Sequence, residues 1–230
     1  MIWRWLSRAP AFAVLAILFA ACGDSGALAV APSATAATAP SAAVATPAAA
    51  RFAWTVSDKS KATVRVREQL ASLNLPSDAV LVASGAKGAF DLNADGTFVA
   101  GSQITFDVSS LTSDSPQRDN FVKQSVLASR QFPTATFVPS KTTGLTLPLA
   151  SNGHLAFKLA GTLTIHGTAK DVTFDVDATR NGSSLTATAT LSPTVKFEDF
   201  GMSQPAAPGR VLSVVDEIKM TIELVATGGV

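Results

Sequence analysis

Large apolar residues recur at every second position through much of residues 51–230, and this alternation constrains the fold more than any other feature of the chain. It is clearest in the runs 104–108 (ITFDV) and 172–176 (VTFDV). A two-residue period places apolar side chains on one face of a strand and polar side chains on the other. Strands of this kind are typical of antiparallel sheets. Further runs with the same period cover residues 52–56, 61–68, 154–165 and 218–224.

Short turn signals separate these runs. An Asp-Gly pair stands at 95–96 and an Asn-Gly pair at 181–182, and both dipeptides favour type I′ hairpin turns. A His-Gly pair at 166–167 indicates a third tight connection. The first two pairs predict hairpins between the runs 89–92 and 97–104, and between the runs 172–178 and 185–191.

One segment, residues 115–129, breaks the alternation. Pro116 directly follows Ser115, an arrangement that favours the first turn of a helix. We expect a short helix here that covers one end of the sheet, followed by a strand through 136–137. With eight or nine strands joined by short turns, the predicted fold is all-β: an eight-stranded antiparallel barrel with one short helix. A closed barrel leaves no edge strand unpaired. A β-sandwich is the alternative.

The N-terminal residues have the pattern of a targeting signal. Residues 1–8 carry two arginines and no acid, residues 11–21 are uninterruptedly apolar, and Cys22 follows. Residues 18–22 (LFAAC) resemble a bacterial lipobox, which predicts a lipoprotein signal peptide over 1–21 and lipidation of Cys22. The alternatives are cleavage by ordinary signal peptidase, with Cys22 incidental, and an uncleaved signal anchor.

Residues 22–50 are dominated by Ala, Pro, Ser and Thr, so we expect a disordered tether between the signal peptide and a barrel domain over 51–230. The whole chain carries a formal charge of only +1, which argues against a nucleic-acid-binding protein, since such a protein needs a basic surface. A single cysteine excludes an internal disulfide and a multi-cysteine metal site.

Residues suited to catalysis or metal binding are scarce. The chain has two histidines, His154 and His166, and both fall at predicted strand ends or turns, where solvated side chains are expected. The run 91–96 (DLNADG) resembles the start of a calcium loop but lacks the downstream glutamate, so a polar turn is favoured. We expect no catalytic residues, no metal and no cofactor, and hence no enzyme activity.

Several short motifs, in order along the chain, resemble the YceI family. They are 110–114 (SLTSD), 118–122 (RDNFV), 131–137 (QFPTATF), 160–174 (AGTLTIHGTAKDVTF) and 199–201 (DFG), followed by a last strand at 215–222. The resemblance covers residues 52–226. It implies a lipocalin-like barrel, periplasmic or secreted, that holds a polyisoprenoid or another long-chain amphiphile. Some relatives are thought to dimerise, so the resemblance also implies a homodimer as a possible state.

The alternation predicts which side chains face the barrel interior. A lining of this kind suits an acyl or isoprenoid chain, but a fully packed core needs the same residues. The predicted ligand-lining residues are Trp54, Val66, Phe106, Phe137, Phe157, Leu159, Leu163, Phe174, Met220 and Ile222, and Val64 and Ile104 share the inner face. Arg118 has two interpretations: it contacts an anionic head group at the barrel mouth, or it ties the helix to the sheet while Asp119 favours the helix dipole.

Two functional hypotheses follow. The first is a lipid-binding protein of the bacterial cell envelope, anchored through Cys22 with its barrel in the periplasm. An outer-membrane location is favoured because Gly23, and not an acid, follows Cys22. Secretion is the alternative location. The second hypothesis is a structural or protein-interaction barrel with a solid core and no ligand. The interior volume of the barrel distinguishes the two.

Overall fold

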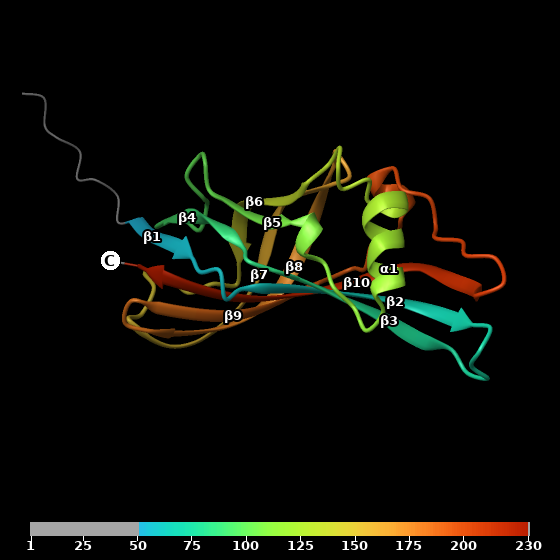
Figure 1. Ribbon diagram of the computed structural model, residues 1–230. Coiled ribbons are helices and arrows are strands. Elements are labelled where there is room, and N and C mark those ends of the chain that lie inside the picture. The colour runs from blue at the N-terminus through green and yellow to red at the C-terminus, as the bar shows by residue number, and fades with distance from the viewer. Residues whose placement is uncertain (1–50, 230) are drawn as a thin grey trace, which may run out of the picture. The chain divides into compact units, whose positions relative to one another are not determined.

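Residues 51–229, the part of the chain that the computed structural model describes, form ten β-strands, one short α-helix and three single-turn helices (Figure 1). The predicted signal peptide, tether and Cys22 lie outside the described residues. The strands are β1 (Arg51–Val56), β2 (Lys61–Leu70), β3 (Ser77–Ser84), β4 (Lys87–Asn93), β5 (Gln103–Asp107), β6 (Thr134–Thr143), β7 (Asn152–Ile165), β8 (Thr168–Asn181), β9 (Ser184–Leu191) and β10 (Val211–Gly228). The helical elements are α1 (Pro116–Phe121), η1 (Val108–Ser110), η2 (Val122–Val126) and η3 (Glu198–Phe200).

Eight of the strands close into a ring. They follow the order β1-β4-β5-β6-β7-β8-β9-β10, and β10 pairs back with β1. Every pairing between these strands is antiparallel. The predicted eight-stranded antiparallel barrel is therefore confirmed, and the sandwich alternative is wrong.

Two further strands, β2 and β3, extend the barrel wall at one end. β1 and β2 lie one after the other along the long strand β10, and the break between them is bridged by Ser60. The fully buried Ser60 hydroxyl donates to the Val225 carbonyl at 3.2 Å and accepts from the Val225 N–H at 2.9 Å. This side chain thus replaces ladder hydrogen bonds where the backbone leaves the sheet.

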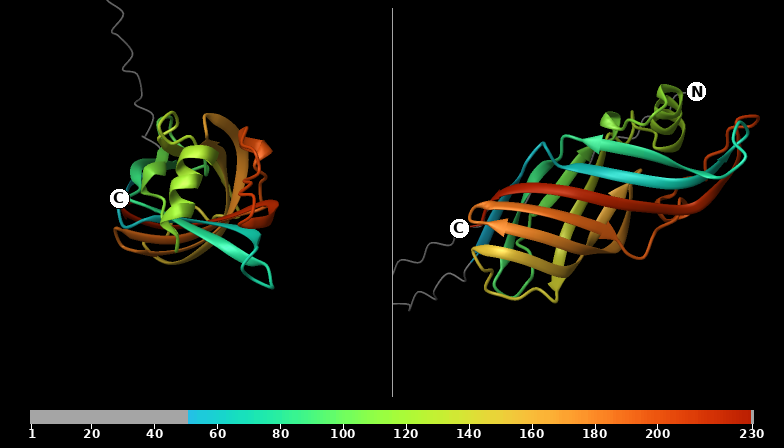
Figure 2. Two further views of the ribbon diagram at one scale, coloured as in Figure 1. Left: turned by 45° about the vertical axis from the view of Figure 1, so that its right-hand side comes forward. Right: turned by 90° about the horizontal axis from the view of Figure 1, so that it is seen from below.

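Only the β2 edge of the β2–β3 hairpin is paired along its length with a strand of the barrel. β2 pairs with β10 and with β3, whereas the outer edge of β3 pairs with no strand: it makes an isolated bridge from Val82 to Thr112 and hydrogen bonds between the Ser84 backbone and the Ser110 hydroxyl. The rest of that edge does not pair with β5, so the ring is incomplete at this end. Figure 2 shows the hairpin projecting beyond the ring, with α1 lying over the opening.

The predicted helix begins where expected. Ser115 is its N-cap, with the hydroxyl accepting a hydrogen bond from the Arg118 N–H at 3.4 Å, and Pro116 is the first helical residue. The α-helical part ends at Phe121 and continues as the single π-helical turn η2. No helix within residues 51–229 is both long and apolar enough to cross a bilayer.

The turn types differ from the prediction. The Asn-Gly pair does connect two strands, but Asn181 is the last residue of β8 and only Gly182 has a positive φ. At 95–96, again only the glycine has a positive φ, and the next strand begins at 103 and not at 97. The predicted type I′ turns are therefore wrong at both places. Both residues of the His-Gly pair have positive φ, as a type I′ turn requires.

Arg180 closes the end of the barrel opposite the hairpin. Its guanidinium lies 5.2 Å from the Trp54 ring and 5.5 Å from the Phe52 ring, and it is 5% exposed. Its nitrogens donate to backbone carbonyls of residues 149, 150, 182 and 229. These carbonyls and the two aromatic faces compensate for the buried charge, so Arg180 ties together the segments that close this end of the barrel.

Candidate ligand cavity

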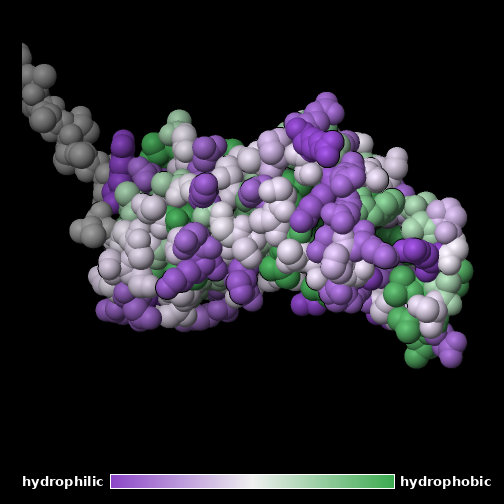
Figure 3. Space-filling view, in the orientation of Figure 1, coloured by the Kyte–Doolittle hydropathy of each residue, from purple (hydrophilic) through white to green (hydrophobic). Residues whose placement is uncertain are grey.

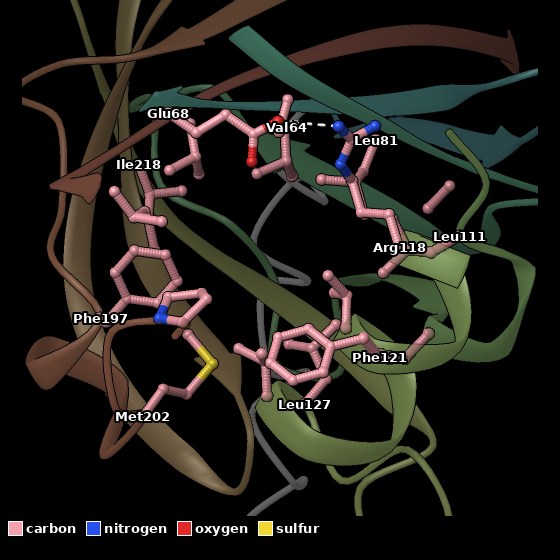
Figure 4. A pocket seen from close by; sticks show the side chains of 18 of the residues that line it. Val64, Glu68, Leu81, Leu111, Arg118, Phe121, Leu127, Phe197, Met202 and Ile218 are labelled. Carbon is pink, nitrogen blue, oxygen red and sulfur yellow. Dashed lines mark hydrogen bonds and ion pairs between the residues drawn. The ribbon is translucent and has the colours of Figure 1, made fainter. Parts of the chain in front are cut away.

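A cavity of about 700 Å³ occupies the barrel end that the β2–β3 hairpin extends. Its wall is predominantly apolar, and Figure 4 shows side chains from β2, β3, the α1 region and the segment before β10 converging on it. Pockets for small ligands commonly measure about 300–1,000 Å³, so the cavity has the size of a binding site. The barrel is hollow at this end.

The exposed residues among the cavity lining show where it opens. They are Ala71 and Ser72 after β2, Asp114 and Gln117 at the start of α1, and Gly209 and Arg210 before β10. These three segments, 70–72, 114–118 and 209–210, form the rim of the cavity. The deeper wall consists of buried apolar side chains, so a ligand would place its apolar part inside and its polar part at the rim.

Polar side chains at the rim are bonded to each other. Arg118 donates to Glu68 at 2.7 Å and also to Asp114, and the dashed line in Figure 4 marks the first contact. Arg210 donates to the side-chain carbonyl of Gln117. Glu68 is only 8% exposed and Arg118 is 18% exposed. The ion pair therefore joins the helix to β2 across the cavity entrance.

Of the two interpretations of Arg118, this geometry favours the structural one. The guanidinium already contacts two carboxylates, and its neighbour Asp119 accepts from the Ser113 backbone N–H at 2.8 Å and from the Ser113 hydroxyl at 2.6 Å. The charges of Glu68 and Asp114 offset those of Arg118 and Arg210 at the rim. An anionic head group would have to compete with these carboxylates for the guanidinium.

The predicted lining residues divide between two cavities. A second, smaller cavity of about 80 Å³ lies toward the Arg180 end of the barrel. Phe137 and Ile222 border both cavities, and Phe137 packs edge-to-face on Phe174 with ring centroids 5.2 Å apart. The large cavity is lined by Val66, Phe106, Phe137, Leu163, Met220 and Ile222, whereas Trp54, Phe157, Leu159 and Phe174 line only the small one.

Sequence reasoning missed a large part of the wall. The inner face of β3 contributes Ala79, Leu81 and Ala83, but alternate residues in this strand are also apolar, so periodicity did not mark it as a strand. Further wall residues come from the end of α1 and from loops and turns, where the two-residue period of a strand does not apply. They include Leu111, Phe121, Leu127, Phe197 and Met202.

Both histidines, and the acidic residues of the 91–96 run, lie away from the large cavity. His154 contacts Asp177 at 2.8 Å on the exposed face of the β7–β8 hairpin, and His166 lies in the following turn against Phe132. The run 91–96 forms a polar turn in which Asp95 accepts from Thr97. Over residues 51–229, no three His, Cys, Asp or Glu side chains are placed to hold a metal ion.

Four aspartates have a pKa below the usual value, and in each the largest cause is a side-chain hydrogen bond. Lys170 lowers the pKa of Asp199 and Lys158 lowers that of Asp175, while Thr97 and Ser109 act on the other two, Asp95 and Asp107. None of the four lines the large cavity. These shifts therefore belong to surface contacts and turns.

Comparison with known proteins gives a family and a fold. The sequence profile of the YceI-like domain matches residues 54–226. A polyisoprenoid binding domain from Saccharophagus degradans superposes with a TM-score of 0.56 at 10% identity, covering 77% of this chain and 99% of that one. A mutant YceI protein of Campylobacter jejuni gives a TM-score of 0.50 at 21% identity, covering 69% and 90%. No curated protein matches the sequence significantly.

Proposed function

This chain belongs to the YceI-like domain family, and we propose that its barrel binds a long-chain amphiphile, isoprenoid-like or fatty, in the cell envelope without covalent chemistry. The observation that carries the proposal is the apolar cavity of about 700 Å³ with its polar rim. Enclosing an apolar chain removes its surface from water, at about 25 cal/mol per Å². The rim groups then fix the position of the polar end.

The likeness to the Saccharophagus degradans domain supports the same ligand class, since that protein is a polyisoprenoid binding domain. The alternative of an interaction module with a solid core is less favoured because of the cavity. At the rim, the mutual pairing of Arg118 with Glu68 and Asp114 favours a ligand with an uncharged polar end.

Filling the cavity tests the proposal. Ala79 lies on the cavity wall and is 6% exposed, so Ala79→Phe places a ring in the space a ligand would occupy. We expect the wild-type protein, incubated with envelope lipids, to retain a long-chain species in native mass spectrometry. Ala79→Phe should lower the retained fraction at least about tenfold. The matched control is Ala156→Phe, at an exposed position of β7. Equal retention in both variants, or an empty wild type, would refute ligand binding in this cavity.

We further propose that Cys22 is lipidated and holds the barrel at a membrane, with an outer-membrane location favoured. An acyl anchor resists high salt, whereas electrostatic adsorption does not. Cys22→Ser should therefore release the processed protein into the soluble fraction. A Cys22→Ser protein that is processed and still sediments with membranes, or a wild type removed by salt, would favour the alternatives of secretion or adsorption.

A further inference from the structure

An apolar surface lies beside the cavity rim, at the end of the projecting hairpin. Leu73 and Leu75 lie in the β2–β3 turn, and Leu212 and Val215 lie at the start of β10, which pairs with the end of β2 through Val211 and Leu70. The four side chains are 45–75% exposed. We call this surface, residues 71–76 with Leu212 and Val215, the apolar tip. Figure 3 shows the corresponding hydrophobic cluster at the end of the molecule that carries the hairpin.

Charged groups are almost absent from the segments that build the tip. Residues 69–77 contain none, and residues 203–215 contain only Arg210. A surface of leucines with a single cation suits the boundary between lipid head groups and acyl chains, where apolar side chains are buried and a cation faces phosphate. The composition is less suited to a polar protein partner, which would require complementary charges.

The tip is continuous with the cavity. Leu70, Ala71 and Ser72 line the rim, and Leu73 follows directly as part of the tip. From β10, Val211 and Val214 line the cavity while Leu212 and Val215, adjacent in sequence, are exposed. A bilayer that contacts the tip therefore also contacts the cavity entrance, and an apolar chain can pass between them with little exposure to water.

We propose that the apolar tip docks on a lipid bilayer and that the cavity exchanges its ligand with the membrane there. This inference rests on the proposed function for the ligand, and on the exposed leucines for the docking. A second copy of the chain is a less suitable occupant because a standard protein interface uses about 20–30 residues on each side, whereas the tip is narrow. A chain as long as residues 22–50 can span at most about 100 Å, so a membrane anchor at Cys22 is compatible with the tip reaching the same membrane.

A site-specific probe tests the docking directly. Cys22 is the only cysteine, so a full-length Cys22→Ser chain with Leu75→Cys carries one label, here an environment-sensitive nitrobenzoxadiazole dye. The matched control is Val138→Cys in the same background, because Val138 is an exposed apolar residue of β6 outside the tip, 44% exposed. The protein is reconstituted with vesicles of three parts phosphatidylethanolamine to one part phosphatidylglycerol, with and without brominated acyl chains.

We expect brominated lipid to quench the label at position 75 and to leave the label at position 138 unchanged. Quenching at neither position, or equally at both, would overturn the docking proposal. This holds even if another part of the chain attaches the protein to the vesicle, because the two positions are compared in the same background. A change at position 75 that depends on protein concentration without vesicles would instead assign the tip to a second copy.

A second measurement separates this inference from the proposed function. The variant Leu73→Ser/Leu75→Ser leaves the cavity wall intact, so binding of a dispersed fluorescent prenyl alcohol should be unchanged. Extraction of the same alcohol from vesicles should slow at least about tenfold, while Val138→Ser extracts at the wild-type rate. If the wild type does not bind dispersed alcohol, the proposed function fails. If it binds and the double variant extracts normally, only the docking proposal fails.

Discussion

The ion pair between Arg118 and Glu68 should hold α1 over the cavity. Replacing Arg118 should lower the free energy of unfolding more than replacing Glu68. Arg118→Met leaves Glu68 without a partner at a position only 8% exposed. Removing one partner of a fully buried pair costs about 3–5 kcal/mol. This pair lies at the cavity rim and is not fully buried, so we expect a smaller cost, about 2–3 kcal/mol. Glu68→Gln retains an acceptor for Arg118, which also keeps Asp114, so its cost should be about 1 kcal/mol.

Urea denaturation followed by circular dichroism measures both costs as free energies of unfolding. The double variant Arg118→Met/Glu68→Gln no longer contains an unpaired buried carboxylate, so it should be no less stable than Arg118→Met alone. Additive losses in the double variant, or a larger loss for Glu68→Gln than for Arg118→Met, would refute the structural role. In that case the head-group interpretation of Arg118 would regain support.

Three further changes test the barrel itself. Gly161→Ala should destabilise the fold by about 2 kcal/mol, since a Cβ there would come within 2.5 Å of the Phe137 ring; chemical denaturation measures this, and a neutral result would contradict it. Arg180→Leu should lower the unfolding free energy by about 2–3 kcal/mol, because buried carbonyls lose their donor; an unchanged thermal midpoint would count against the sealing role. Lys170 lowers the pKa of Asp199, so this contact stabilises the fold above about pH 4 and is lost as pH falls below it. Wild type should therefore lose more stability between pH 6 and pH 2.5 than Asp199→Asn, and parallel curves would exclude the contribution.

Strand positions could be predicted from the sequence where one face of the strand is exposed, because apolar and polar residues then alternate. The runs 154–165 and 172–176 lie within β7 and β8, which pair along their whole length. Turn types did not follow, because a dipeptide preference is outweighed by the strand register. In the β8–β9 hairpin, Asn181 pairs with Ser184 and remains in the ladder, so the turn begins one residue later than expected.

The interior position of a residue was predictable, but its relation to a cavity was not. Phe106 and Phe157 both belong to runs in which large apolar residues recur at every second position, yet Phe106 lines the large cavity and Phe157 only the small one. Alternation reports which face of the sheet a side chain occupies, whereas the cavity depends on how far the opposite wall lies. That distance is set by β3 and α1, which are brought to the barrel by contacts remote in sequence.

The difference in length between neighbouring strands explains why the barrel opens where it does. β10 pairs with β9 only from Thr221 onward and with β1 only at 226–228, so its first half extends past the ring. β2 and β3 pair along that extension, but β5 ends at Asp107 and cannot complete the circle. The missing wall is supplied by α1 and the segment before β10, which are joined at the rim by the hydrogen bond from Arg210 to Gln117 and not by a hydrogen-bonded ladder. A barrel built in this way has a cavity and an apolar hairpin end at the same place, and both result from one extended strand.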